Sequence, residues 1–162
     1  MTMGNVKQEI VNYLKKNRYC VLCTCSENSP RATPVRYWSD DVKIIIYSEK
    51  YTAKFKLLEK NSNVSLAIYS TRRPLKGLQL WGKAEVIKSG DERHDMYLPP
   101  QIKKNPKLQG VKKVLNLIQI TPNKIVMLDQ SKKGNCFLLW ESDKMGKGKE
   151  KEIKTLRGAS KV

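Results

Sequence analysis

The chain has a single histidine, four cysteines and no long apolar run among its 162 residues. No segment approaches the roughly 20 apolar residues that a membrane-spanning helix requires, so no such helix is expected. The first 16 residues are polar, carry spaced lysines and lack the apolar segment of a secretory signal, which predicts a cytoplasmic protein. The apolar fraction of 40% still suffices for one hydrophobic core.

Few cysteines are present, but three of them lie close together as Cys20, Cys23 and Cys25. Their spacing suggests a metal site. Side chains alternate along a strand, however, so Cys20 is expected to point away from the other two, and no second ligand pair follows. We therefore predict no metal site and interpret the cysteines, including Cys136, as reduced small hydrophobic residues.

Acidic residues are also scarce, with 15 Asp and Glu against 32 Lys and Arg and a formal net charge of +17. A balance this basic favours anionic partners such as nucleic acid, phosphorylated cofactors, acidic lipids or acidic substrates. The lysines are spread along the chain without an arginine-rich cluster or a nucleic-acid-binding motif. Nucleic acid is therefore not the preferred partner.

The order of apolar segments predicts a mainly β fold with flanking helices. Residues 42–47 are nearly all β-branched or aromatic, which indicates burial on both faces, and Gly82 in mid-strand indicates a bulge or a close backbone approach. Helices are expected at 6–16, 53–60 and 91–97, the last stopped by Pro99 and Pro100. Strands are expected at 19–25, 31–38, 42–47, 64–69, 78–88, 115–120, 124–128 and 135–141.

One helix among mostly adjacent strands favours a closed antiparallel β-barrel of six or more strands over a parallel sheet. Residues 1–141 are expected to form this single domain. Residues 142–162 are rich in lysine and glycine and poor in apolar residues, so we expect a basic, mobile C-terminal tail.

Hydroxyl and ammonium groups precede the expected helix at 53–60, in the pattern Ser48-x-x-x-Thr52-x-Lys54. The free N–H groups and the dipole of a helix N-terminus favour a phosphate, to which the hydroxyls add hydrogen bonds and Lys54 adds a full charge. The alternative is a surface helix for which Thr52 is only the N-cap residue.

A second pattern lies on the expected strand at 31–38, which begins Arg31-Ala32-Thr33-Pro34-Val35-Arg36-Tyr37. Proline in a strand requires an edge, where unpaired backbone groups remain available to a flat ring. Arg31 is suited to pair with an anionic ring or a phosphate. The alternative is an edge strand with solvated arginines.

In sequence order, these two patterns and Trp81-Gly82-x-Ala84 resemble the FMN-binding split-barrel family, which includes pyridoxamine 5′-phosphate oxidase. The likeness extends over residues 6–88 and also rests on the strand at 20–25 and on Leu57-Leu58-x-x-Asn61. The resemblance implies a split barrel, FMN, and a homodimer with flavins at the subunit interface. It also implies an oxidoreductase acting on a small organic substrate.

The resemblance also implies roles for individual residues. The flavin ring and ribityl chain would lie along residues 31–36, the phosphate would be held near the start of the helix at 53–60, and two further residues would reach the cofactor of the other subunit. The cofactor-binding residues expected on this basis are Arg31, Ala32, Thr33, Pro34, Val35, Arg36, Tyr47, Ser48, Thr52, Lys54, Gln79 and Trp81.

Other functions stay open. A deazaflavin with an acidic tail suits the positive charge, whereas haem requires an axial ligand, and the single histidine, His94, is interpreted as a solvated surface residue. A non-enzymatic basic barrel that binds nucleic acid, or a barrel that serves only as a dimeric interaction module, are further alternatives. The C-terminal Arg-x-His element of pyridoxamine 5′-phosphate oxidase is absent, so that specific activity is not expected.

Overall fold

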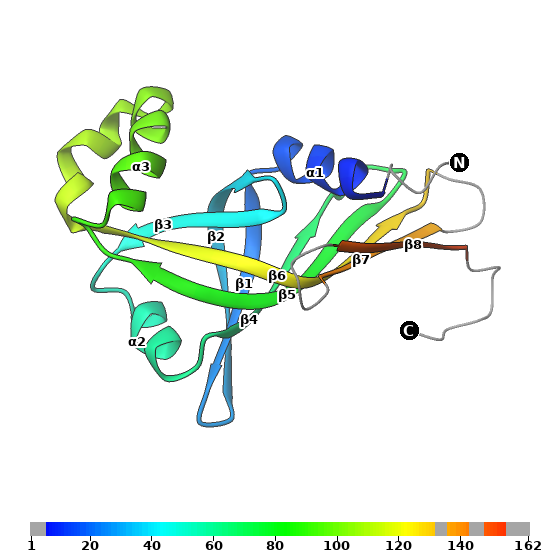
Figure 1. Cartoon of the computed structure of the whole chain (residues 1–162), viewed down its shortest axis with the longest axis horizontal. Coiled ribbons are helices and arrows are strands. Elements are labelled where there is room, and N and C mark those ends of the chain that lie inside the picture. Colours follow the sequence, from blue (N-terminus) through cyan, green and yellow to red (C-terminus); the bar gives the residue numbers. More distant parts are fainter. Residues whose placement is uncertain (1–5, 132–135, 143–147, 155–162) are drawn as a thin grey trace.

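The computed structural model describes residues 6–131, 136–142 and 148–154 (Figure 1). Its helices are α1 (Val6–Lys16), α2 (Ala53–Lys60), α3 (Glu92–Lys104) and the 3-10 helix η2 (Pro106–Val114). Its strands are β1 (Tyr19–Ser26), β2 (Ser29–Asp40), β3 (Lys43–Glu49), β4 (Asn63–Tyr69), β5 (Lys76–Ile87), β6 (Leu115–Asp129), β7 (Cys136–Ser142) and β8 (Gly148–Lys154).

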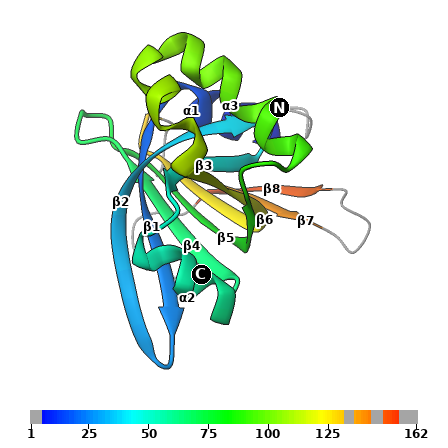
Figure 2. The ribbon, with the colours of Figure 1, turned by 90° about the vertical axis from the view of Figure 1, so that its left-hand side faces the viewer.

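Six antiparallel strands close into a barrel in the order β3-β2-β1-β4-β5-β6, because β3 also pairs with β6. The closing register places Ile44 opposite Ile120 and Ser48 opposite Asn116. Strands β7 and β8 continue the sheet beyond β6. The predicted mainly β architecture with flanking helices is confirmed. Figures 1 and 2 show the turn between β1 and β2 projecting from one end of the barrel.

Strand β6 runs unbroken from Leu115 to Asp129, so the prediction of two separate strands at 115–120 and 124–128 is wrong. Its first part pairs with β3 and its last part with β7, while β5 accompanies both. The irregularity falls at Gly82, where the β5–β6 register shifts and Gly82 faces Pro122. A Cβ on Gly82 would lie 2.4 Å from the carbonyl oxygen of Thr121. The bulge and the close approach predicted for Gly82 are both confirmed.

Helix α3 continues through Pro99 and Pro100 to Lys104, so the prediction that these prolines end it is wrong. Asp91 is the N-cap residue of the helix, and its carboxylate accepts a hydrogen bond from the backbone N–H of Arg93 at 2.9 Å. Leu98, immediately before the prolines, is fully buried and packs with residues of β3, β5 and β6. This packing offsets the backbone hydrogen bonds that two prolines cannot donate.

His94 lies on the buried side of α3, and the prediction of a solvated surface residue is wrong. Its side chain has no exposed surface, and Nε2 lies 3.0 Å from the carbonyl oxygen of Leu115. The sequence did not indicate this burial, because the neighbours Asp91, Arg93 and Asp95 are polar. The ring fills the junction between α3 and the start of β6.

Two groups of buried apolar residues form the core. The larger fills the barrel, and the smaller lies between β3 and the α3–η2 segment. Strand β3 contributes to both, because Ile44 and Ile46 face the barrel while Ile45 faces α3, and all three are completely buried. Burial of this strand on both faces is confirmed.

Strand β8 pairs along β7 and occupies residues that were expected to belong to the mobile tail. The prediction for 143–147 and 155–162 lies outside the described residues. Cys20 is buried in the barrel, whereas Cys23 and Cys25 are half-buried on the other face of β1, as predicted. Within the described ranges, no three potential metal-ligating side chains gather, and none of the helices is both long and apolar enough to cross a membrane.

Candidate functional site

The end of β3 and the start of α2 bring Ser48, Thr52 and Lys54 together. The Lys54 ammonium lies 2.8 Å from the Ser48 hydroxyl oxygen and 3.2 Å from that of Thr52, and the two hydroxyl oxygens are 3.3 Å apart. The chain turns at Glu49, whose carbonyl oxygen accepts hydrogen bonds from both the backbone N–H and the hydroxyl of Thr52. We call these three residues the α2 cluster.

The α2 cluster holds a partly buried positive charge. Lys54 forms no ion pair within the described part of the chain. Burial lowers the pKa of its ammonium from the ordinary value of 10.5, and the nearby carboxylate of Glu49 only partly opposes this shift. An anion placed here would meet a cation that is already oriented and only partly solvated.

Thr52 occupies the predicted N-cap position of α2, but its side chain does not cap the helix. Its hydroxyl donates to Glu49 O at 3.0 Å instead. Within the described residues, the N-terminus of α2 therefore has no side-chain cap, so its backbone donors remain suited to a bound anion.

Residues 29–36 of β2 pair only with β1, because β3 joins β2 only at residues 37–40. One backbone edge of this stretch therefore has no strand partner among the described strands. Pro30 and Pro34 both lie here, which confirms the edge predicted from Pro34. If the β2–β3 register is continued from Tyr37 opposite Ile46, Val35 and Ser48 flank the point where the two strands separate.

Four of the predicted cofactor residues lie on one outer face of the barrel, in two rows across β2, β1, β4 and β5. Ala32, Cys23, Ser65 and Trp81 form one row, and Pro34, Val21, Ala67 and Gln79 form the other. None of these eight side chains is charged, and the inward-facing neighbours on β1 and β4 are buried. We call these two rows the outer face.

The remaining predicted residues lie elsewhere. On β2, the side chains of Arg31, Thr33 and Val35 lie on the opposite face of the strand from those of Ala32 and Pro34, as the alternation along a strand predicts. Tyr47 packs against Trp38 with ring centroids 5.9 Å apart, away from the α2 cluster. The structure thus joins Ser48, Thr52 and Lys54 directly but does not bring all twelve predicted residues into one pocket of a single chain.

Arg36 lines a cavity that the sequence analysis did not identify. The other cationic side chains there are Lys15 and Arg18, near the end of α1, and Lys104, at the end of α3. They are distant in sequence and share no local motif, so only the fold reveals that they are neighbours.

Residues 6–128 match the pyridoxamine 5′-phosphate oxidase family. The chain belongs to this family. The match covers most of the barrel, including the α2 cluster and the outer face, and it confirms the resemblance found in the sequence. Comparison with curated protein sequences gives no match.

Solved structures with the same fold share little sequence with the chain. A pyridoxamine 5′-phosphate oxidase-related, FMN-binding protein from Nostoc punctiforme is 15% identical with a TM-score of 0.68, over 91% of this chain and 92% of that one. A FAD-binding protein from Mesorhizobium loti is 16% identical with a TM-score of 0.62, over 74% and 91%. General Stress Protein 26 from Bacillus anthracis is 18% identical with a TM-score of 0.58, over 76% and 93%.

Proposed function

We propose that this protein binds FMN and acts as a flavin-dependent oxidoreductase on a small organic substrate. The observation that carries the proposal is the α2 cluster, in which the Lys54 ammonium and two hydroxyls converge at an uncapped helix N-terminus. A phosphate monoester matches this set of donors in charge and in hydrogen-bonding capacity.

The unpaired edge of β2 suits the ring and ribityl chain of the same cofactor. Among the described strands, residues 29–36 have a pairing partner on one side only, and the β2–β3 pairing ends at Tyr37 opposite Ile46, so the two strands separate beyond that pair. One FMN molecule could therefore place its ring on this edge and its phosphate at Lys54 of the same chain. The FMN-binding and FAD-binding proteins of the same fold support a flavin.

A homodimer explains the positions of Gln79 and Trp81. Within one chain they lie on β5, three strands from β2, which corresponds to about 14 Å at the usual strand spacing. The outer face between them is uncharged, and Trp81 remains 39% exposed. Packing this face against a second copy would bury it and carry Gln79 and Trp81 toward the cofactor of the partner.

The protein needs little acid–base apparatus of its own for such an activity. FMN supplies the redox chemistry when it is bound, while the chain binds it, orients it and controls access to it. Lys54 and the two hydroxyls would hold the phosphate, and the β2 edge would fix the plane of the ring. No pair of catalytic carboxylates is required.

Titration with FMN and with riboflavin tests the proposal, because riboflavin lacks the phosphate. Flavin fluorescence quenching should show that the Thr52→Ala/Lys54→Ala variant binds FMN at least about tenfold more weakly, since a hydrogen bond to a charged group contributes about 1.5–3 kcal/mol. Riboflavin affinity should change little. Lys56→Ala, also on α2 but outside the cluster, is the matched control.

Two outcomes would contradict the assignment. The first is a protein that binds neither flavin, and the second is an FMN affinity that does not respond to Thr52→Ala/Lys54→Ala. Reduction and reoxidation of the bound flavin, followed by its absorbance, then test the oxidoreductase activity separately from binding.

A further inference from the structure

A second cavity, of about 570 Å³, lies between α1, the connection from β4 to β5 at residues 70–75 and the last part of β6. Its volume falls within the roughly 300–1,000 Å³ of pockets that enclose small molecules. Among the described residues that line it, none belongs to α2 or α3. Figures 1 and 2 show α1 above the barrel and α2 below it, so this α1 cavity lies away from the α2 cluster.

The floor of the α1 cavity is apolar. Tyr13 and Met127 belong to the barrel core and are only 8% and 3% exposed, yet both line the cavity. Pro74 adds an apolar side chain from the β4–β5 connection. An apolar group that enters the cavity would contact these side chains and lose its exposure to water, which is favourable in proportion to the area buried.

The charge around the α1 cavity is mainly positive. Four basic and two acidic residues line it, namely Lys16, Arg72, Arg73, Lys76, Glu9 and Asp129. The carboxylate of Asp129 already pairs with Lys76 at 2.8 Å. Among the described residues, no carboxylate forms an ion pair with Lys16, Arg72 or Arg73. The balance of charge therefore favours an anionic ligand.

The wall formed by the β4–β5 connection is held in place without a ligand. The carbonyl oxygen of Lys76 accepts hydrogen bonds from the Tyr13 hydroxyl at 2.9 Å and from the backbone N–H of Ser70 at 3.0 Å. The backbone N–H of Arg72 donates to the Ser70 hydroxyl oxygen at 3.3 Å. These bonds fix the backbone of the connection and leave the guanidinium groups of Arg72 and Arg73 available to a ligand.

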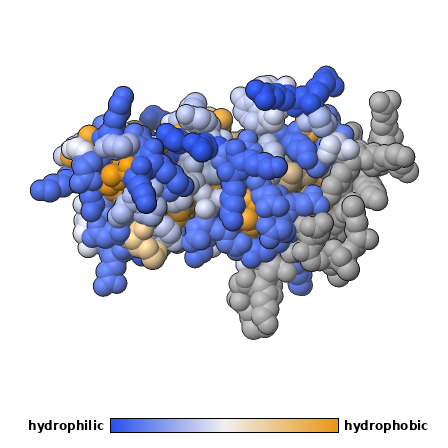
Figure 3. All heavy atoms as spheres, turned by 90° about the horizontal axis from the view of Figure 1, so that it is seen from above, coloured by the Kyte–Doolittle hydropathy of each residue, from blue (hydrophilic) through white to orange (hydrophobic). Residues whose placement is uncertain are grey.

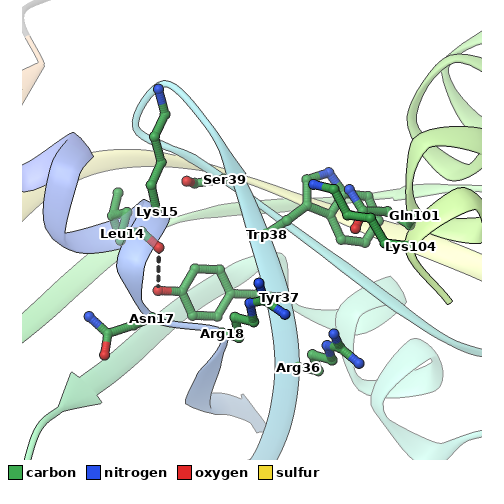
Figure 4. Close-up of a pocket in the computed structure, with 10 residues that line it drawn as sticks. All are labelled: Leu14, Lys15, Asn17, Arg18, Arg36, Tyr37, Trp38, Ser39, Gln101 and Lys104. Carbon is green, nitrogen blue, oxygen red and sulfur yellow. Dashed lines mark hydrogen bonds between the residues drawn. The ribbon is translucent and has the colours of Figure 1, made fainter.

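The wall formed by α1 is fixed as well. The Tyr37 hydroxyl donates to the carbonyl oxygen of Leu14 at 3.0 Å and ties α1 to β2 (Figure 4). The side-chain amide of Asn17 donates to the carbonyl oxygen of Tyr13 at 2.8 Å. The dipole of α1 accounts for Lys16 in its last turn, but not for two arginines in the facing connection. A bound anion accounts for all three cations.

We propose that the α1 cavity binds a small organic carboxylate with an apolar body. The apolar body would lie against Tyr13 and Met127, and the carboxylate would pair with Arg72 or Arg73, whose planar guanidinium groups match it. Figure 3 shows mainly hydrophilic residues on the face where α1 lies, which suits a ligand whose charged end stays near water. The proposal does not rest on FMN binding at the α2 cluster.

NMR of the full chain labelled with ¹³C at the methionine methyl groups tests the site, with 2-naphthoate as the probe. The signal of Met127, identified from the volume-conserving Met127→Leu variant, should shift during the titration and saturate at one naphthoate per chain. Met96, which is 59% exposed on α3, is an internal control and should not shift. The titration is repeated with FMN added and should give the same result.

Two analogues separate the parts of the ligand. Naphthalene-2-methanol lacks the charge and acetate lacks the apolar body, so each should bind at least about tenfold more weakly than 2-naphthoate.

Arg72→Gln/Arg73→Gln should weaken naphthoate binding at least about tenfold, because a charged hydrogen bond is lost. Lys56→Gln/Lys88→Gln removes the same charge from exposed positions outside the cavity and should change the affinity less than about twofold. Arg72 and Arg73 are exposed, so thermal unfolding should confirm that the variant remains folded.

Four outcomes overturn the proposal. A Met127 signal that does not shift would show that the cavity takes no such ligand. Equal weakening by the arginine and lysine variants would show attraction by general surface charge, and equal binding of acetate would show that the apolar floor has no role. A shift that disappears when FMN is added would place naphthoate at the flavin site. If FMN itself does not bind while the Met127 shift persists, only the FMN proposal fails.

Discussion

The ammonium of Lys54 lies 2.8 Å from the hydroxyl oxygen of Ser48, although the first residue belongs to α2 and the second to β3. Ser48 is held by the pairing of β3 with β6, in which it lies opposite Asn116. Lys54 is held because Phe55, the next residue, is buried in the barrel core. The distance between the two groups is thus set by barrel closure and core packing, which preorganises the site for an anion.

FMN affinity should fall as pH rises. The fall should begin at a lower pH than it would if Lys54 had the pKa of an exposed lysine. Burial lowers the pKa of Lys54 below 10.5 in the folded protein without a ligand, so the ammonium loses its proton before an exposed lysine does. The phosphate prefers the protonated form, and binding must weaken as pH rises through this lowered pKa. Fluorescence titrations between about pH 7 and 10 measure the effect.

Lys54→Arg is the control for this pH dependence. A guanidinium stays charged throughout the range, so the decline in FMN affinity should flatten even if the affinity at pH 7 changes. Riboflavin binding should remain nearly independent of pH in both proteins over this range. A decline that persists in Lys54→Arg would assign the titration to another group.

The outer face should control association of two copies. Ala67 lies in its middle, opposite Val21 on one side and Gln79 on the other. Ala67→Arg places a charge where the proposed interface would exclude water, which costs several kcal/mol if the charge stays unpaired. Sedimentation equilibrium should show a dimer for the unmodified protein and a monomer for the variant.

The same change should weaken FMN binding, because Gln79 and Trp81 of the second copy would no longer reach the cofactor. Gln8→Arg, on the exposed side of α1, adds an equal charge away from the outer face and should leave both properties unchanged. A variant that remains dimeric, or an unmodified protein that is monomeric with FMN bound, would contradict the proposed interface.

Local sequence patterns were sufficient for most of the barrel. The helix at 53–60 and the burial of 42–47 on both faces follow from nearby residues, and the structure confirms both. Gly82 was also informative, because a glycine in mid-strand signals a backbone contact that a side chain would block. The convergence of Ser48, Thr52 and Lys54 follows from their short spacing around one turn.

Features that depend on distant packing were not predictable. The prolines of α3 are local helix breakers, but the helix continues past them, and Leu98 beside them is buried against β3, β5 and β6. His94 has polar neighbours in sequence, but its side chain is fully buried in the structure and contacts the carbonyl oxygen of Leu115. The cavity at Arg36 is formed by residues from three separated elements, and no spacing within one segment encodes it.

Gly82→Ala should destabilise the protein strongly. The added Cβ would lie 2.4 Å from Thr121 O and 2.9 Å from the Cα of Pro122, both backbone atoms that cannot move aside without disturbing the β5–β6 pairing. We expect a loss of about 2–3 kcal/mol in the free energy of unfolding, measured by urea titration. Gly110→Ala is the control, because nothing lies within 4 Å of its added Cβ. Similar stabilities of the two variants would be inconsistent with the close approach.

Asp129 should make the protein sensitive to acid. Its carboxylate is only 2% exposed and lies 2.8 Å from the Lys76 ammonium, and it also accepts hydrogen bonds from Ser131. Desolvation by burial acts to raise its pKa, but the bonds from Lys76 and Ser131 outweigh it and hold the pKa below the ordinary value of 3.8. The stabilisation is present above 3.8 and is lost as pH falls through the lowered pKa.

Asp129→Asn should therefore lower the free energy of unfolding by about 2 kcal/mol at pH 7, because a buried charged hydrogen bond is lost. The difference from the unmodified protein should shrink as pH falls below 3.8 and through the lowered pKa of Asp129, because its carboxylate is then neutralised. Asp41→Asn removes the exposed partner of Lys7 and should cost less than about 1 kcal/mol at any pH. Urea titrations of the three proteins at pH 7 and at low pH measure this. A constant difference between the Asp129→Asn variant and the unmodified protein would mean that the Asp129 carboxylate does not contribute to acid sensitivity.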